Sequence, residues 1–311
     1  MSKITEVAAG ILIRPDGDFL LGSRPEGKPY AGWWEFPGGK LEAGETPYEA
    51  LVRELREEMG IEVEAATPWL VQRFVYPHAT VKLHFFLVSQ WRGEPHPHEG
   101  QAFVWQTAGA TTAEPILPAN TPILRGLELP PTLALSNVAE LGRQGWLDAL
   151  EQALAGGLRW FVLREPQLAR AEYLDLAAAA RTLARRYGAR LLVHGDPALV
   201  EEVGADGVHL PSRLLAEVKE RPQGWCGASV HDAAQLAQAA ELGLDYVMLG
   251  PVLPTLSHPD APTLGWDGFA RLVEQGWPLA VYALGGMRPE FVATARGHGG
   301  HGVAMLRAAW R

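Results

Sequence analysis

Three glutamates in the first third of the chain have a spacing that suits metal chemistry. Glu54, Glu57 and Glu58 stand at i, i+3 and i+4, so a helix would carry their carboxylates on one face. Neighbouring carboxylates repel one another, and such a face is stable only where a cation compensates their charge. Mg²⁺ fits best, with Mn²⁺ as the alternative, because both accept oxygen ligands and Mg²⁺ commonly binds a few carboxylates together with substrate phosphates. The expected chemistry is hydrolysis of a phosphoanhydride by water that the metal activates.

This hydrolysis also needs a base that accepts a proton from the attacking water. Glu45, Glu54 and Glu99 are the candidates, and the sequence leaves the choice among them open. Arg53 lies between the acidic and the apolar face of the helix, where it could orient Glu57 by an ion pair.

The residues around these glutamates predict one helix with defined ends. Thr46 can cap the first turn, Pro47 suits the first helical position, and Glu49 completes a capping-box spacing. Gly60 ends the helix as a C′ glycine. The apolar stripe that faces the core is expected to consist of Val52, Leu55 and Met59.

A glycine pair, Gly38-Gly39, lies upstream of this helix, in the loop that leads into it. Glycine has no Cβ, so the backbone there can approach a phosphate or a metal ion closely. Trp33 and Trp34 come just before the pair, where their rings could stack on a nucleobase or pack against the sheet.

Residues 39–61, GKLEAGETPYEALVRELREEMGI, resemble the Nudix box at every defined position. Over its first 125 residues the chain also resembles the MutT branch of that family, the 8-oxo-dGTP diphosphatases. The landmarks are the segments 35–40 (EFPGGK), 98–101 (HEGQ) and 117–120 (LPAN), which occur in the same order and at similar spacing. The resemblance implies release of a nucleoside monophosphate and pyrophosphate, which removes oxidised guanine nucleotides before a polymerase uses them and so avoids DNA damage.

The resemblance also implies a set of site residues. The Glu matching Glu99 reaches the metal from a loop, Phe36 lies against the base, and Asn120 hydrogen-bonds the purine edge with an amide that both donates and accepts. The implied substrate-binding residues are Arg24, Glu35, Phe36, Gly38 and Asn120. The implied catalytic residues are Glu45, Arg53, Glu54, Glu57, Glu58 and Glu99, and the implied metal ligands are Gly39, Glu54, Glu57, Glu58 and Glu99.

Three of these residues have structural alternatives. Phe36 could be a core residue, Glu99 a solvated loop charge, and Asn120 a turn or helix-cap residue. The chain has His78-Ala79-Thr80 where the bacterial family often has an arginine, so one contact to the base is expected to be lost.

The composition limits what else the chain can bind. A formal net charge of −9 provides no broad basic surface for duplex DNA or anionic lipid, whereas a small nucleotide stays compatible because a divalent ion supplies local positive charge. Cys226 is the only cysteine, which excludes an intramolecular disulfide and fits a reducing cytoplasm. The sequence has no signal-peptide pattern and no apolar run of about 20 residues. We therefore expect a soluble cytoplasmic protein, of unspecified oligomeric state, that does not enter membranes.

The chain divides into two parts with different patterns. Residues 1–128 mix short strands with one long helical stretch, which predicts an α+β Nudix fold with a hairpin turn at Asp16-Gly17. Two adjacent prolines in LELPPT make residues 129–132 the expected linker. Residues 133–311 alternate β-rich and helical runs, which predicts an α/β (β/α)₈ TIM-like barrel with little room for an eighth helix. The expected barrel strands are Leu133–Asn137, Leu158–Glu165, Ala189–His194, Gly207–Leu210, Gly227–His231, Tyr246–Val252, Leu279–Leu284 and Gly302–Leu306.

Residues 133–311 resemble thiamine-phosphate synthase and its relative TenI. The matching segments are 161–165 (FVLRE), 204–210 (GADGVHL), 229–231 (SVH), 250–255 (GPVLPT) and 284–287 (LGGM). The family places Asn-Asp-Arg after its third strand, where this chain has His194-Gly195-Asp196, and segment 211–215 lacks the second metal-binding Asp. The lysines expected near Pro166 and His258 are absent, and Pro251 replaces the TenI-type histidine. The resemblance therefore implies a degenerate barrel, because nothing remains to balance the charge of a diphosphate.

A binding role remains open for this barrel. Gly285-Gly286 could form a phosphate cup of backbone N–H groups for a phosphorylated ligand. His231, His209 and Asp206 are expected at or near the carboxyl ends of strands, where barrel active sites lie, although such a histidine is often structural.

Three functions compete at this point. The leading one is a Mg²⁺-dependent pyrophosphohydrolase that converts 8-oxo-dGTP to 8-oxo-dGMP, with a barrel inactive as a synthase. The second is a bifunctional thiamine-linked enzyme whose Nudix half cleaves a thiamine-related diphosphate. The third is a metabolite-sensing module without turnover, against which the complete carboxylate set argues.

Overall fold

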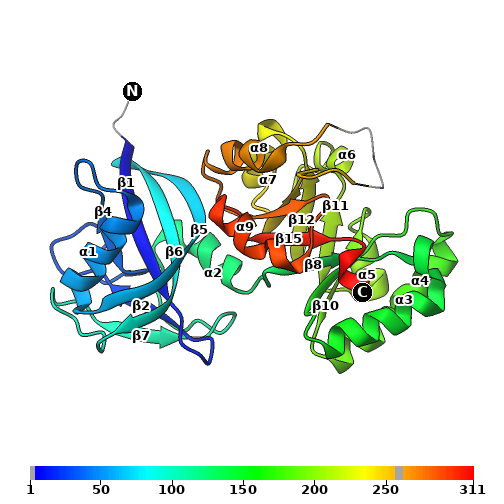
Figure 1. The fold of residues 1–311 in the computed structure, drawn as a ribbon, viewed down its shortest axis with the longest axis horizontal. Helices are drawn as coiled ribbons and strands as arrows, with labels where there is room; N and C mark the ends of the chain where they lie inside the picture. Colours follow the sequence, from blue (N-terminus) through cyan, green and yellow to red (C-terminus); the bar gives the residue numbers. More distant parts are fainter. Residues whose placement is uncertain (1–3, 256–261) are drawn as a thin grey trace. The chain divides into compact units, whose positions relative to one another are not determined.

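The computed structural model describes residues 4–255 and 262–311, and the chain divides into two compact units (Figure 1). One unit comprises Met1–Leu129 with Val273–Pro278, and the other comprises Pro130–Leu272 with Leu279–Arg311. None of the described helices has the length and apolar character that crossing a bilayer requires.

The N-terminal unit has an α+β fold built on two sheets. The larger sheet has the order β4-β1-β6-β5, with the bounds Gly38–Lys40, Ile4–Leu12, Ala79–Arg92 and Glu62–Tyr76. The smaller sheet has the order β3-β2-β7, with the bounds Trp34–Glu35, Phe19–Ser23 and Phe103–Gln106. β1 and β6 run parallel, and the other strand pairs of these two sheets are antiparallel.

The turn expected at Asp16-Gly17 is present, but the hairpin around it is short. The N–H of Arg14 donates to the carbonyl of Asp18 at 2.8 Å, and Ile13 pairs with Phe19 in a single antiparallel bridge. Beyond this bridge β1 and β2 separate into different sheets. The turn therefore carries the chain from one sheet to the other.

One long helix, α1 (Pro47–Met59), packs against β1, β4 and β5. Its buried residues are Ala50, Leu51, Leu55 and Met59. The expectation that Val52 belongs to this stripe was wrong: Leu51, not Val52, is in line with Leu55 and Met59 at the four-residue spacing of a helix face. Gly10 of β1 allows the helix to lie close, because a Cβ there would be 2.9 Å from Leu55 Cδ1.

A second core cluster lies among β1, β2, β5 and β6, with the aromatic residues Phe19, Phe36, Trp69 and Phe85. The 3-10 turn η1 (Pro118–Asn120) leads into α2 (Thr121–Leu127), whose Ile123 joins this cluster. The packing under α1 and this cluster together hold β3, β4 and α1 in place, and these elements carry the candidate site.

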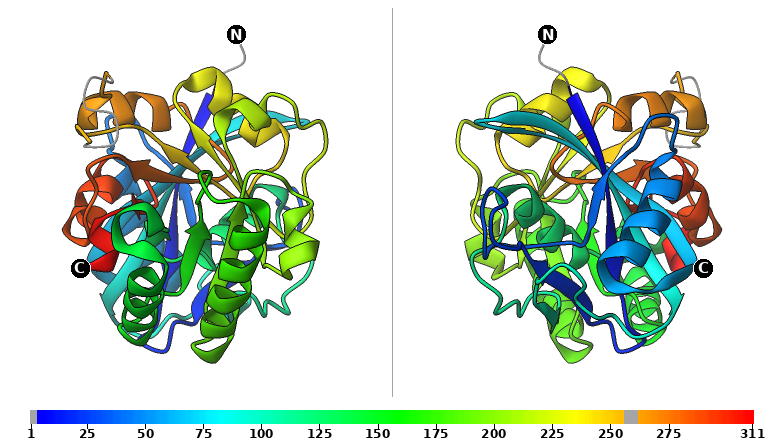
Figure 2. Two further views of the ribbon diagram at one scale, coloured as in Figure 1. Left: turned by 90° about the vertical axis from the view of Figure 1, so that its right-hand side faces the viewer. Right: turned by 90° about the vertical axis from the view of Figure 1, so that its left-hand side faces the viewer.

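The C-terminal unit is a closed barrel of eight described parallel strands, as expected. The strands β8 to β15 are Thr132–Leu135, Trp160–Leu163, Arg190–His194, Gly207–Leu210, Trp225–Val230, Tyr246–Leu249, Ala280–Leu284 and Gly302–Met305. The helices α3 to α9 are Val138–Ala155, Arg170–Arg186, Leu199–Val203, Ser212–Leu215, Ala233–Glu241, Gly265–Val273 and Val292–Gly297, with the 3-10 turn η2 (Pro289–Phe291) before α9. These helices lie outside the strands (Figure 2).

The eighth helix is reduced to one turn. After β15 the structure has the 3-10 turn η3 (Ala308–Trp310), and the indole N–H of Trp310 donates to the carbonyl of Leu135 at 2.9 Å. This bond attaches the turn η3 to the end of β8.

Candidate active site

Helix α1 has the ends that its sequence predicts. The Thr46 hydroxyl accepts from the Glu49 N–H at 3.3 Å, and the Glu49 carboxylate accepts from the Thr46 N–H at 2.8 Å, which completes a capping box. Pro47 stands at the first helical position, and Gly60 ends the helix in the left-handed conformation with φ 70°. Because both ends are fixed locally, the direction of each glutamate on α1 is set by its position in the helix.

Glu54 and Glu58 extend from α1 toward the glycine pair. The N–H of Gly38 donates to Glu58 Oε2 at 3.0 Å. A Cβ on Gly39 would lie only 2.2 Å from Glu54 Cδ, so the carboxylate of Glu54 occupies the space that any other residue would fill. Gly38 has φ 144°, and a Cβ there would lie 2.1 Å from the carbonyl oxygen of Ala8. Both glycines are therefore required by close approach.

Glu58 is held in unusual surroundings for a carboxyl group. Burial, as the largest cause, and the nearby charges of Glu54, Glu35 and Glu99 together raise its pKa to about 8, against the lowering effect of the Gly38 N–H. The charges of three other acidic side chains thus act on Glu58, and a cation at this end of the site would relieve that repulsion.

Arg53 connects the other glutamates of the box. Its guanidinium donates to both oxygens of Glu45 at 2.9 Å, to Glu54 Oε1 at 2.8 Å and to the carbonyl of Lys40 at 3.0 Å. These bonds raise the pKa of Arg53, and the bond from Arg53 together with the Glu42 N–H lowers the pKa of Glu45. Both oxygens of Glu45 are engaged, so this carboxylate is a positioning group in the structure.

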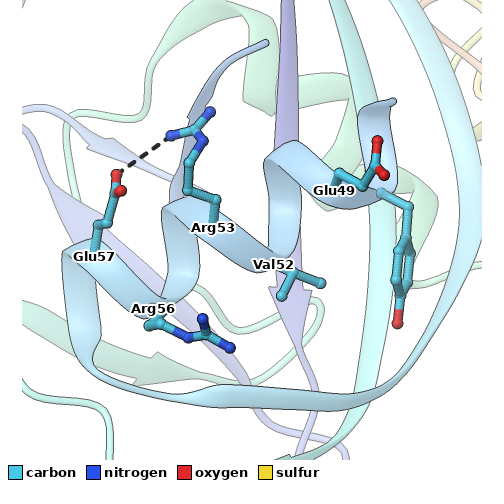
Figure 3. Close-up of a pocket in the computed structure, with 6 residues that line it drawn as sticks. Glu49, Val52, Arg53, Arg56 and Glu57 are labelled. Carbon is cyan, nitrogen blue, oxygen red and sulfur yellow. Dashed lines mark hydrogen bonds and ion pairs between the residues drawn. The ribbon is translucent and has the colours of Figure 1, made fainter. Parts of the chain in front are cut away.

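Glu57 lies at the outer side of α1. It is exposed, and Arg53 reaches it at 3.3 Å across one helical turn, as the sequence predicts (Figure 3). Both residues line a depression of about 330 Å³ on the outer side of α1, together with Tyr48, Glu49, Val52 and Arg56. Of the three carboxylates expected on one face, Glu54 and Glu58 approach the glycines and Glu57 lines the depression, while Arg53 Nη1 joins Glu54 to Glu57.

A larger pocket of about 610 Å³ lies between α1, the glycine pair and the loops that follow β2 and β6. Its acidic lining includes Glu35, Glu54, Glu58 and Glu99. Its basic lining includes Arg24, Lys28 and Lys40. Its aromatic lining includes Tyr30, Tyr76, His78 and Phe103. A pocket of this size and mixed lining suits a small phosphorylated molecule.

Two ion pairs form between residues that line this pocket. Arg24 Nη1 donates to both oxygens of Glu35 at 2.6 Å, and burial raises the pKa of Glu35 while Arg24 lowers it. Lys28 Nζ lies 3.1 Å from Glu99 Oε2, with both side chains about half exposed. Exposed pairs of this kind contribute little to stability, so Glu99 is free to exchange Lys28 for another cation.

The structure separates Phe36 and Asn120 from the pocket lining. Phe36 is 3% exposed and packs against Phe19 and Phe85, with ring centroids 5.9 and 6.0 Å away. In this structure Phe36 is therefore a core residue, the alternative that the sequence left open. Asn120 is 4% exposed and stands before α2 without a side-chain capping bond. Neither residue, nor Trp33 or Trp34, is among the described residues that line the pocket.

A divalent ion fits the acidic end of the pocket. Glu54 and Glu58 lie on adjacent turns, and the Gly39 backbone lies against Glu54. Within residues 4–255 and 262–311, no three acidic or histidine side chains are grouped closely enough to hold a metal ion by themselves. Mg²⁺ usually takes one or two carboxylates and completes its shell with water and substrate phosphate, so this pair meets its requirement.

The barrel residues singled out by the sequence differ in their surroundings. His209 is fully buried, and its ring nitrogens lie 3.0 Å from the Tyr246 hydroxyl and 2.9 Å from Ser229 Oγ, which makes it structural. His231 follows β12 and is exposed, with Nδ1 2.6 Å from the Gly250 carbonyl. The prediction that Asp206 lies near the carboxyl end of a strand was wrong. Asp206 precedes β11 and accepts a hydrogen bond from the Leu191 N–H at the amino end of the strands.

The glycine pair of the barrel is packed tightly. Gly285 and Gly286 have φ 98° and 70°, and a Cβ on either would lie 2.8 Å from the segment Pro251–Leu253. Both glycines are therefore required by packing in this structure. His258, near which the sequence lacks an expected lysine, lies outside the described residues.

Comparison with known proteins finds a different family in each of the two parts of the chain. Residues 4–125 match the NUDIX domain model, and residues 136–309, more than half of the chain, match the thiamine monophosphate synthase model. The first part is thus a Nudix hydrolase domain. The chain as a whole belongs to the thiamine monophosphate synthase family and carries this hydrolase domain in front of its barrel.

Individual relatives match one half each. An 8-oxo-dGTP diphosphatase of Haemophilus influenzae is 43% identical over 125 residues, which are 40% of this chain and 92% of that protein. A CTP pyrophosphohydrolase of Escherichia coli is 40% identical over 122 residues, which are 39% of this chain and 90% of that protein. A thiamine-phosphate synthase of Limosilactobacillus fermentum is 37% identical over 171 residues, which are 52% of this chain and 79% of that protein.

Two pocket residues, Tyr30 and Lys28, escaped the sequence analysis. They lie in the loop between β2 and β3, which has no regular pattern. A tyrosine and a lysine between prolines and glycines read as ordinary loop residues, and only the tertiary contacts place them in the site.

Proposed function

We propose that the NUDIX domain is a Mg²⁺-dependent nucleoside triphosphate pyrophosphohydrolase whose best substrate is 8-oxo-dGTP, which it converts to 8-oxo-dGMP and pyrophosphate. The observation that carries this proposal is the convergence of Glu54 and Glu58 on Gly38-Gly39 inside a pocket large enough for a nucleotide. The name of the H. influenzae relative supports the oxidised guanine nucleotide, and such an activity would clear the nucleotide pool of a mutagenic precursor.

The chain's own residues prepare the reaction. The Gly38 N–H holds Glu58, and Arg53 holds Glu54, so both carboxylates face the glycine pair before substrate arrives. A divalent ion bound there supplies charge neutralisation for the phosphates and a lowered pKa for the attacking water. Arg24 and Lys28 also line the pocket, and a bound phosphate would take the place of their partners Glu35 and Glu99 as the group that balances their charge.

The proton of the attacking water passes to Glu54 or Glu99. Both line the pocket, whereas Glu45 does not, and both of its oxygens already accept from Arg53. Glu99 becomes available when its exposed ion pair with Lys28 opens, which costs little free energy.

The proposal is tested with Glu58→Gln. The substitution keeps the shape and an acceptor for the Gly38 N–H but removes the charge, so we expect the rate of pyrophosphate release with Mg²⁺ to fall at least about a thousandfold. Glu62→Gln is the matched control, because Glu62 is exposed on β5 and pairs only with the exposed Arg92 among its described partners. The substrate panel contains 8-oxo-dGTP, dGTP and dCTP. Equal kcat/KM for all three nucleotides would refute the preference for 8-oxo-dGTP. Equal rates for E58Q and wild type would refute the role of the Glu58 carboxylate in hydrolysis.

For the barrel we propose binding of a phosphorylated ligand without thiamine-phosphate synthesis. His194 stands where the synthase family has asparagine, next to a position at which the family binds Mg²⁺. Burial, and to a smaller extent the charges of Arg164 and Arg213, lower the pKa of His194, so two cationic side chains act on this position. The match of residues 136–309 to the synthase family favours a ligand from the same chemical class.

A further inference from the structure

An aromatic group forms a separate part of the pocket lining in the NUDIX domain. Tyr30, Tyr76 and His78 all line the pocket. The Tyr30 ring centroid lies 5.7 Å from that of Tyr76 and 6.1 Å from that of His78, and Tyr76 and His78 stack at 5.5 Å. All three are partly or largely exposed, so their rings are accessible from the pocket. Such faces attract planar heterocycles.

Tyr30 is held in this group by the loop between β2 and β3. Arg24 Nε donates to the carbonyl of Pro29 at 2.7 Å, the Gly32 N–H donates to the Arg24 carbonyl at 2.9 Å, and both bonds close the loop around Tyr30. Tyr30 is the one described non-glycine residue with positive φ, at 61°. This backbone is unfavourable for a tyrosine, and it persists because the surrounding bonds impose it.

Tyr76 is fixed independently at the end of β5. It forms a hydrogen bond with the backbone of Ala119, and its ring packs against Phe74 at 4.6 Å. Two elements far apart in sequence, the loop after β2 and the β5–β6 turn, thus bring their rings together at the pocket. Packing alone would not require both rings to remain partly exposed.

The residues that the family resemblance assigns to the base do not line this pocket. Phe36 is buried in the core and Asn120 is 4% exposed. In this structure the exposed ring faces of Tyr30 and Tyr76 are therefore better placed than an amide edge to meet a base.

We propose that Tyr30 is a specificity-determining residue of this domain, whose ring forms with Tyr76 the surface on which the nucleobase stacks. The inference rests on the proposed nucleotide substrate and adds how the base is held. Recognition through a ring face favours the larger bicyclic purines over pyrimidines, because they offer more stacking area.

The test measures binding to the full chain, so that it does not depend on turnover. Tyr30→Asn removes the ring and suits the positive φ, since asparagine tolerates the left-handed region. We expect the Kd for dGMP with Mg²⁺, measured by calorimetry, to rise about tenfold or more, the effect typical of losing one stacking ring. The Kd for inorganic pyrophosphate should stay unchanged, because the phosphate end does not use the ring. Tyr30→Phe should restore dGMP binding, and Tyr48→Asn, on the outer side of α1, is the matched control.

Each outcome decides the inference. Weaker dGMP binding with unchanged pyrophosphate binding, together with restoration by Tyr30→Phe, supports it. Unchanged dGMP binding in Tyr30→Asn, or equal weakening of both ligands, overturns it. If Tyr30→Asn unfolds, Tyr30→Gly replaces it under the same criteria, because glycine adopts a positive φ without strain. If wild type binds dGMP through Tyr30 but hydrolyses no triphosphate, the proposed function fails and this inference stands.

Discussion

Replacing Gly39 by alanine tests the geometry at the acidic end of the pocket. A Cβ there would lie 2.2 Å from Glu54 Cδ and 2.3 Å from both carboxylate oxygens, whereas ordinary contact begins at 3.4 Å. Glu54 would have to move by about 1 Å or more, and a displacement of that size between aligned groups costs about a hundredfold in rate. We therefore expect kcat/KM of Gly39→Ala to fall about a hundredfold. The melting temperature should change little, because the displaced group is the end of a flexible side chain.

The assay is initial-rate release of pyrophosphate over a series of Mg²⁺ concentrations, with thermal unfolding followed by circular dichroism. Gly297→Ala in α9 is the control, because a Cβ there meets nothing within 4 Å. Wild-type kcat/KM in Gly39→Ala would refute the position that we assign to Glu54.

Two further predictions concern the barrel. Burial and the charges of Arg164 and Arg213 lower the pKa of His194 to about 4, so between pH 6.5 and 4 the unfolded chain binds the additional proton. The free energy of unfolding is therefore not reduced by this group above pH 6.5, and it falls by about 3 kcal/mol as the pH drops toward 4. Thermal unfolding of His194→Gln should show a weaker pH dependence than that of wild type. The full chain should form no thiamine phosphate from the thiazole phosphate and the pyrimidine diphosphate in the presence of Mg²⁺; chromatographic detection of product would contradict the barrel proposal.

The parts of the site that could be predicted from sequence are those fixed by local interactions. Thr46, Glu49 and Gly60 determine the ends of α1 within one helical turn, so the direction of Glu54 and Glu58 follows from their positions. The barrel strands were equally predictable, because each is a short apolar run between helices and is buried on both faces. In both cases the interactions that determine the structure lie within the same short segment of sequence.

The rest depends on tertiary contacts that no local pattern encodes. Val52 and Leu51 are both apolar, and the packing of α1 on β1 decides which of them is buried. Tyr30 reaches the pocket because Arg24 and Glu35, eleven positions apart, hold its loop. Glu57 has a helical spacing that favours the acidic face, yet its side chain is largely exposed and lines the outer depression with Arg53.

The contacts of Arg53 affect how changes in this domain combine. One guanidinium binds Glu45, Glu54 and Glu57 at once, so removing any one of them frees donors that the other two can take up. Free energies of such neighbours do not add, and a double-mutant cycle within this set would give a large coupling term. Natural variation in this set should therefore be correlated, with tolerated substitutions at one of the three acids depending on which residues occupy the other two positions.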